Sequence, residues 1–89
     1  MASNERNDSI RKEVLFQLYA VKPLARTAEQ VERECRKQGL DFSKGEIASE
    51  MQFLADEGLL ILIAEPGTTA KTFRIHSSGV RHYEQNYAA

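Results

Sequence analysis

Apolar residues in the first quarter of the chain recur at gaps of one, three and four positions. The residues on this stripe are Ile10, Val14, Leu15, Leu18 and Tyr19. Such spacing predicts an amphipathic helix. Asp8 or Ser9 is expected to cap it, and residues 1–8 are expected to form a disordered tail. Because Pro23 disfavours helical geometry in the residue before it, the helix is predicted to end there. Residues 24–26 are then expected to form a short extended connector.

Two further helices are predicted by matching start and stop signals. One opens at Thr27 and the other at Ser43, each followed three residues later by Gln or Glu, which is the pattern of a reciprocal capping box. Each ends in a glycine followed by leucine, at Gly39 and Gly58, which suits a left-handed closing residue with a hydrophobic contact behind it. The pattern therefore indicates two helices joined by a short turn.

The period of the pattern changes after the second of these glycines. Residues 59–64 form a continuous apolar run, which predicts a buried strand. Residues 65–71 contain a Pro-Gly turn signal, and residues 72–76 alternate between polar and apolar, as a half-buried strand does. A β-hairpin is expected here. Beyond it, residues 79–87 are predicted to form a short helix capped by one of the two preceding serines.

Composition narrows the classes of function. With 89 residues, the chain is expected to fold as one domain over residues 9–87, whose core is too small to enclose a large cofactor. Twelve basic against thirteen acidic residues give a net charge of −1, which excludes a polycation that binds nucleic acid by charge alone. No motif of a nucleophilic triad, a metal site or a phosphate loop is present, so neither catalysis nor a cofactor is expected.

Cellular location is inferred from two features. Cys35 is the single cysteine, so no internal disulfide can form and a reducing compartment is the simplest interpretation. The apolar run at 59–64 is far shorter than a bilayer span. A cytoplasmic protein without membrane contact is expected, and Cys35, which shares the apolar stripe of its helix, is expected to be a buried structural thiol.

The order of these elements resembles the winged helix-turn-helix superfamily, as found in small stand-alone bacterial or prophage regulators. Residues 47–60 are similar to the family's third helix running into a strand through Leu-x-x-x-Gly-Leu-Leu, and residues 72–80 are similar to its last strand and closing helix. The resemblance covers nearly the whole chain. It implies an α+β fold with a three-helix core, a two-stranded β-hairpin wing and a short C-terminal helix.

The resemblance also implies a transcriptional regulator that binds double-stranded DNA. Helix 44–57 would enter the major groove, and the wing over residues 65–72 would touch the backbone or the minor groove. The side chains that match DNA contacts of the family are Arg26, Ser43, Lys44, Ser49, Gln52, Thr68, Thr69, Lys71 and Arg74. Those within residues 43–52 would read base edges, those in the wing would hold the backbone, and Arg26 would clamp a phosphate.

The charge of helix 44–57 differs from what a DNA-reading helix of this family needs, because the helix contains one lysine and four acidic residues. Glu46 and Glu50 lie four residues apart on one face, and we expect them to flank the reading surface. One interpretation makes Glu46 only the acid of the capping box and Glu50 a solvated residue. In the alternative function, Glu46, Glu50 and Phe53 face a protein partner or a second copy of the chain, and the scaffold is a protein-interaction module.

Overall fold

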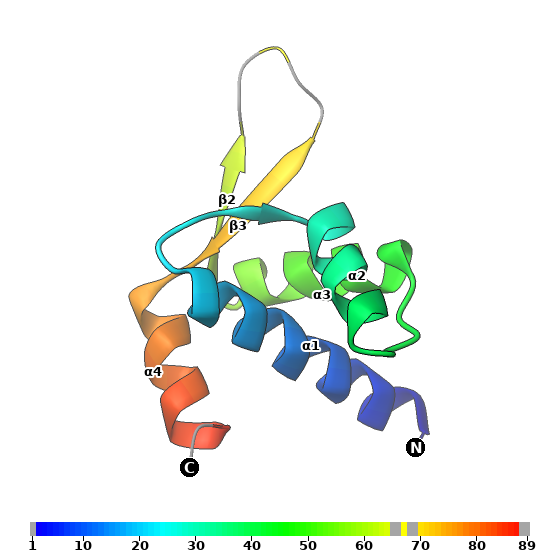
Figure 1. The fold of residues 1–89 in the computed structure, drawn as a ribbon. Helices are drawn as coiled ribbons and strands as arrows, with labels where there is room; N and C mark the ends of the chain where they lie inside the picture. The colour runs from blue at the N-terminus through cyan, green and yellow to red at the C-terminus, as the bar shows by residue number, and fades with distance from the viewer. Residues whose placement is uncertain (1, 65–66, 68–69, 88–89) are drawn as a thin grey trace.

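The computed structural model describes residues 2–64, 67 and 70–87, and its architecture is that of a small α+β domain (Figure 1). In this part of the chain it has four helices and three strands. Their order is α1 (Ala2–Val21), β1 (Arg26–Thr27), α2 (Ala28–Lys37), α3 (Lys44–Asp56), β2 (Leu60–Ala64), β3 (Lys71–Ile75) and α4 (Ser77–Asn86). The predicted order of elements is confirmed.

The strands form one antiparallel sheet in the order β1-β3-β2. β2 and β3 pair along their full length, from Leu60 opposite Ile75 to Ala64 opposite Lys71. The extended connector becomes the two-residue edge strand β1, in which Arg26 lies opposite Phe73. Side chains alternate between the two faces of a strand, so β3 turns its buried residues toward the helices and presents Thr72 and Arg74 on the other face.

The core lies where α1, α2 and α3 meet the inner face of the sheet. Most residues of the apolar stripes expected for the three helices are buried there, whereas Tyr19, Ala28 and Ala55 are partly buried and Ala48 is exposed. The buried apolar residues are Ile10, Val14, Leu15, Leu18, Val31, Cys35, Ile47, Met51, Leu54, Leu60, Phe73, Ile75 and Tyr83. α4 packs on the side of α1, where the rings of Tyr19 and Tyr83 have centroids 4.8 Å apart.

Both capping boxes form as predicted. At α3, the Ser43 hydroxyl accepts from the Glu46 amide at 3.1 Å, and the Glu46 carboxylate accepts from the Ser43 amide at 3.1 Å. Thr27 and Gln30 make the same reciprocal pair at the start of α2. These bonds satisfy amides that a helix leaves unpaired at its N-terminus, so the start of each helix is fixed locally.

The two predicted glycine stops are also confirmed. Gly39 and Gly58 have φ angles of 79° and 81°, in the left-handed region that favours glycine. After α3, the amide of Leu59 donates to the Leu54 carbonyl at 2.9 Å, which is the six-residue bond of a Schellman motif. The chain therefore reverses sharply from α3 into β2.

The predicted start of α1 is wrong. Asp8 and Ser9 lie inside the helix, which begins at Ala2, so the disordered tail expected over residues 1–8 is replaced by helix from residue 2 onward. The cause is a tertiary contact, because the Arg6 guanidinium reaches the turn before α3 and donates to the Asp41 carbonyl at 2.7 Å. A contact between segments this distant in sequence leaves no mark on the local pattern.

The cap of the last helix also differs from the prediction. His76, not Ser77 or Ser78, is the N-cap, and its Nδ1 accepts from the Ser78 amide at 3.1 Å. The Ser78 hydroxyl donates instead to the Gly58 carbonyl at 2.6 Å. That bond ties the start of α4 to the turn after α3. Within the described residues, no helix combines the length and apolar character needed to span a bilayer.

Gly79 allows α4 to approach the start of β2 closely. A Cβ at this position would lie 2.2 Å from the Leu59 carbonyl oxygen and 2.8 Å from Cγ1 of Ile75. Gly79→Ala must therefore displace α4, and we expect it to lower the free energy of unfolding by about 1–3 kcal/mol in urea denaturation. Gly45→Ala is the control, because a Cβ there meets no atom within 4 Å. Equal stability of both variants would contradict this packing.

Candidate nucleic-acid interface

An open groove runs between the start of α2, the exposed side of α3 and β3. Its lining comes from three separate parts of the sequence: Thr27, Ala28, Glu29, Lys44, Ala48, Ser49, Gln52, Ala70, Lys71 and Phe73. Four of the residues matched to DNA contacts meet here, namely Lys44, Ser49, Gln52 and Lys71. The fold thus brings together polar side chains that are up to 27 positions apart in the chain.

Helical spacing explains which α3 residues line the groove. Lys44, Ala48 and Gln52 succeed one another at steps of four, so they lie on one flank of the helix. The buried apolar residues of α3 are directed into the core, and Ser49 is exposed. The Gln52 amide nitrogen donates to the Asp56 carboxylate at 3.0 Å, which orients the amide along the exposed side of the helix.

The described lining of the groove carries two lysines against one glutamate, so it has a small excess of positive charge although the whole chain does not. Lys44 and Lys71 are exposed, and neither forms an ion pair with another described residue. Glu29 is the one acidic side chain in the described lining, and Arg33 pairs with it at 3.6 Å. The first amides of α2 add the partial positive charge of a helix N-terminus on the same side.

Contrary to our expectation, Glu46 in the first turn of α3 and Glu50 one turn later do not flank the groove but face α1. Nε of Arg6 lies 2.6 Å from the Glu46 carboxylate, and Nε of Arg11 lies 2.5 Å from the Glu50 carboxylate. The capping role expected for Glu46 is confirmed, but the solvated role expected for Glu50 is wrong, since its residue exposure is only 8%. A buried carboxylate needs such a partner, and Arg11 supplies it.

Phe53 lies on the same α1-facing flank of α3. The residue is 40% exposed, and the guanidinium carbon of Arg11 lies 4.0 Å from the centroid of its ring. The three residues of the protein-interaction alternative therefore do share one surface, but arginines of α1 already contact all three. Only part of the Phe53 ring is left as an apolar surface for a partner.

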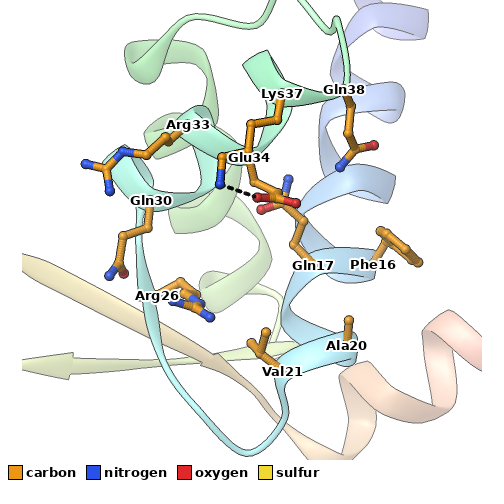
Figure 2. A pocket seen from close by; sticks show the side chains of 10 residues that line it. All are labelled: Phe16, Gln17, Ala20, Val21, Arg26, Gln30, Arg33, Glu34, Lys37 and Gln38. Carbon is orange, nitrogen blue, oxygen red and sulfur yellow. Dashed lines mark ion pairs between the residues drawn. The ribbon is translucent and has the colours of Figure 1, made fainter.

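The other residues matched to DNA contacts lie outside the groove. Ser43 uses its hydroxyl to cap α3. Arg26 lines a different cavity, between α1 and α2 (Figure 2). Arg74 lies on the face of β3 opposite to Lys71 and the buried Phe73, across from Ile61. Thr68 and Thr69 lie outside the described residues.

Sequence reasoning missed the contribution of α2 to the groove. Thr27, Ala28 and Glu29 line it, although the sequence favoured the neighbouring Arg26 as the phosphate contact. A signal was present, because the capping box at Thr27 fixes where the first free amides of α2 lie. Arg6 and Arg11 were missed as partners of the α3 carboxylates, and no spacing along α1 could have assigned them.

Two kinds of reactive group, metal-ligating side chains and the single thiol, can be located in the structure. In the described ranges, no three His, Cys, Asp or Glu residues gather closely enough to hold a metal ion. Cys35 is buried, as predicted, and burial raises the pKa of its thiol. Its thiol is therefore less readily ionised than a free cysteine, which suits a structural residue.

Comparisons of the chain with protein-family models, with curated proteins and with solved structures find no match. Its function therefore has to be inferred from the groove, the charges around it and the side chains that the fold brings together.

Arg6 controls the ionisation of Glu46. The hydrogen bond from Arg6, and after it the bond from the Ser43 amide, lowers the pKa of Glu46 from 4.5 to about 2. Because the folded-state pKa is depressed, the stabilisation is present above pH 4.5 and is lost as the pH falls toward 2. In Arg6→Gln, carboxyl ¹³C NMR should show the Glu46 pKa rising toward 4.5.

Arg33→Gln is the matched control, because Arg33 pairs with Glu29 on α2 and not with α3. It should leave the Glu46 titration unchanged. In urea denaturation, the difference in stability between the native chain and Arg6→Gln should be present near neutral pH and vanish near pH 2. A Glu46 pKa that stays near 2 in Arg6→Gln would show that the α1–α3 ion pair does not form in solution.

Proposed function

We propose that this chain is a winged helix-turn-helix domain that binds double-stranded DNA and acts as a small transcriptional regulator. α3 would be the recognition helix in the major groove, and the β2–β3 hairpin would be the wing against the backbone. The observation that carries the proposal is the meeting of Lys44, Ser49, Gln52 and Lys71 in one open groove whose described lining has a small excess of positive charge.

The arrangement of α2 and α3 supports this assignment. Both helices start at a capping box and end at a left-handed glycine, and the turn between them is short, as in a helix-turn-helix unit. The antiparallel sheet combines β1, which precedes α2, with the β2–β3 hairpin, which follows α3 and projects away from the helices (Figure 1). This fold leaves one long side of α3 exposed, which a recognition helix requires because it must fit into the major groove.

The position of the acidic side chains also favours DNA over a protein partner that would bind the acidic face of α3. Glu46 and Glu50 are neutralised by Arg6 and Arg11 on the flank away from the groove. On the side that lines the groove, α3 presents Lys44 at its start and contributes no carboxylate, because the partly exposed Glu46 side chain pairs with Arg6 on the other flank. The start of α3, together with Lys71 of β3, is therefore the part of the domain best suited to approach phosphates.

Each side chain of the groove has a distinct role in the proposed complex. Lys44 and Lys71 are point charges on flexible stems and would bind phosphates without regard to sequence. Gln52 would read a base edge, because its amide can donate and accept at adenine. Its bond to Asp56 uses one proton of the amide nitrogen and leaves the second proton and the carbonyl oxygen available.

The net charge of −1 restricts how tightly such a domain can bind. Few cations face the groove, so few counterions would be released on binding, and non-specific affinity would be low. Binding to the preferred sequence would then depend on base contacts from α3 and, where two copies bind adjacent half-sites, on dimerisation of the chain on DNA.

A protein-interaction module that uses Glu46, Glu50 and Phe53 remains the second candidate. It has less support, because both carboxylates are engaged inside the chain and Arg11 covers part of the Phe53 ring. A partner would have to compete with α1 for the same side chains.

Neutralising the groove lysines tests the proposal. Fluorescence polarisation of a pool of random duplexes at low salt should show binding by the native chain. Lys44→Gln and Lys71→Gln should each weaken binding to all sequences and reduce the slope of log K against log salt by about 1. The physical reason is that each lysine releases roughly one counterion from a phosphate.

Lys12→Gln is the control, because this exposed lysine lies on α1 beside Tyr87 and outside the groove. Its affinity and salt slope should equal those of the native chain. The proposal fails if the native chain does not bind DNA at high micromolar concentration. It also fails if all three variants bind as tightly as the native chain.

A further inference from the structure

A second cavity, with a volume of about 360 Å³, lies between the C-terminal half of α1, β1 and α2 (Figure 2). Its two walls differ in chemistry. Phe16, Ala20 and Val21 form an apolar wall along α1, whereas Arg26, Gln30 and Arg33 come from β1 and α2 on the other side. The size falls within the range of sites for small molecules.

Positive charge dominates the polar wall. Three cations line the cavity, Arg26, Arg33 and Lys37, against one acid, Glu34. Lys37 pairs with Glu34 at 3.8 Å, and Arg33 pairs at 3.6 Å with Glu29, which lies outside the cavity lining. Neither pair leaves an uncompensated carboxylate facing the cavity.

Arg26 differs from the other two cations. It is partly buried, yet no ion pair or hydrogen bond joins its guanidinium to any other residue that the structure describes. A guanidinium has five donors and binds a carboxylate through two parallel hydrogen bonds. Figure 2 shows Arg26 between Gln30 and the end of α1, so a bound anion would lie beside the apolar wall.

The apolar wall offers a flat surface. Phe16 is 44% exposed, although its ring centroid lies 6.3 Å from that of Tyr83, which holds one side of it against the domain. Ala20 is also exposed and has no side chain beyond Cβ to obstruct the cavity. A planar ring could therefore lie across Ala20 against the Phe16 ring, at the offset or edge-on geometry that aromatic pairs favour.

We propose that this cavity is a binding site for a small organic anion with an aromatic body, whose carboxylate pairs with Arg26 and whose ring packs on Phe16 and Ala20. Gln30 adds an amide donor at the same end, since only its carbonyl oxygen is used in the cap of α2. The site is distinct from the DNA groove. Its existence does not depend on the proposed function, because the ligand test involves no DNA.

Benzoate is the simplest probe of this chemistry. In ¹⁵N NMR titrations of the native chain, benzoate should cause saturable shifts of amides around Val21, Arg26 and Gln30, with a dissociation constant in the millimolar range expected for so small a ligand. Benzamide, which has the same shape without the charge, and acetate, which has the charge without the ring, should each bind at least about tenfold more weakly.

Two variants test the assigned residues. Arg26→Gln should weaken benzoate binding about tenfold, whereas Arg81→Gln, on α4 outside the cavity, should leave it unchanged. Ala20→Glu should also abolish binding, because it places a carboxylate against Arg26 from an exposed helix position that leaves the core intact. Dispersed amide spectra of both cavity variants verify that they fold.

Several results would overturn the proposal. Equal shifts with acetate would reveal a non-specific anion effect, and equal shifts with benzamide would mean that Arg26 does not recognise the carboxylate. Saturable benzoate binding that survives in folded Arg26→Gln and Ala20→Glu would place the site elsewhere.

Discussion

The ion pairs between α1 and α3 are the constraint on which the rest of the structure depends. Arg6 holds Glu46 and Arg11 holds Glu50, with Arg11 also lying over the ring of Phe53. Glu50 is nearly buried, so removing its partner would leave a carboxylate without compensation, which is far costlier than losing an exposed pair. These contacts extend α1 to its N-terminal end and fix the rotation of α3 about its axis.

The rotation of α3 decides which charges meet solvent. Taken as a sequence, residues 44–57 have a clear excess of acid, which argues against contact with phosphates. In the fold, the carboxylates of Glu46 and Glu50 form ion pairs with arginines of α1. The groove on the other flank of α3 is lined by Lys44, Ser49 and Gln52, together with Lys71 of β3. The net charge of the helix is thus a poor guide to the surface it offers.

Local features could be predicted from the sequence, and contacts between distant segments could not. The caps at Thr27 and Ser43 and the stop at Gly58 were correct, because each depends on residues within one helical turn. The start of α1 was wrong, because it depends on Arg6 reaching across to α3. Contacts between distant segments also explain the misplaced arginines. The resemblance grouped Arg26 and Arg74 with the groove residues, but in the fold Arg26 lines the cavity between α1 and α2, and Arg74 lies on the other face of β3.

The most direct test of the account is a map of where DNA touches the native chain. In ¹⁵N NMR titration with a duplex selected from the random pool, the largest amide shifts should fall at the residues that line the groove, which are 27–29, 70–71 and, on α3, Lys44, Ala48, Ser49 and Gln52. Residues around Arg11 and Phe53, on the other flank of α3, should shift least. If the largest shifts instead surround Arg11 and Phe53, α3 meets its partner with the opposite side, and the account is contradicted.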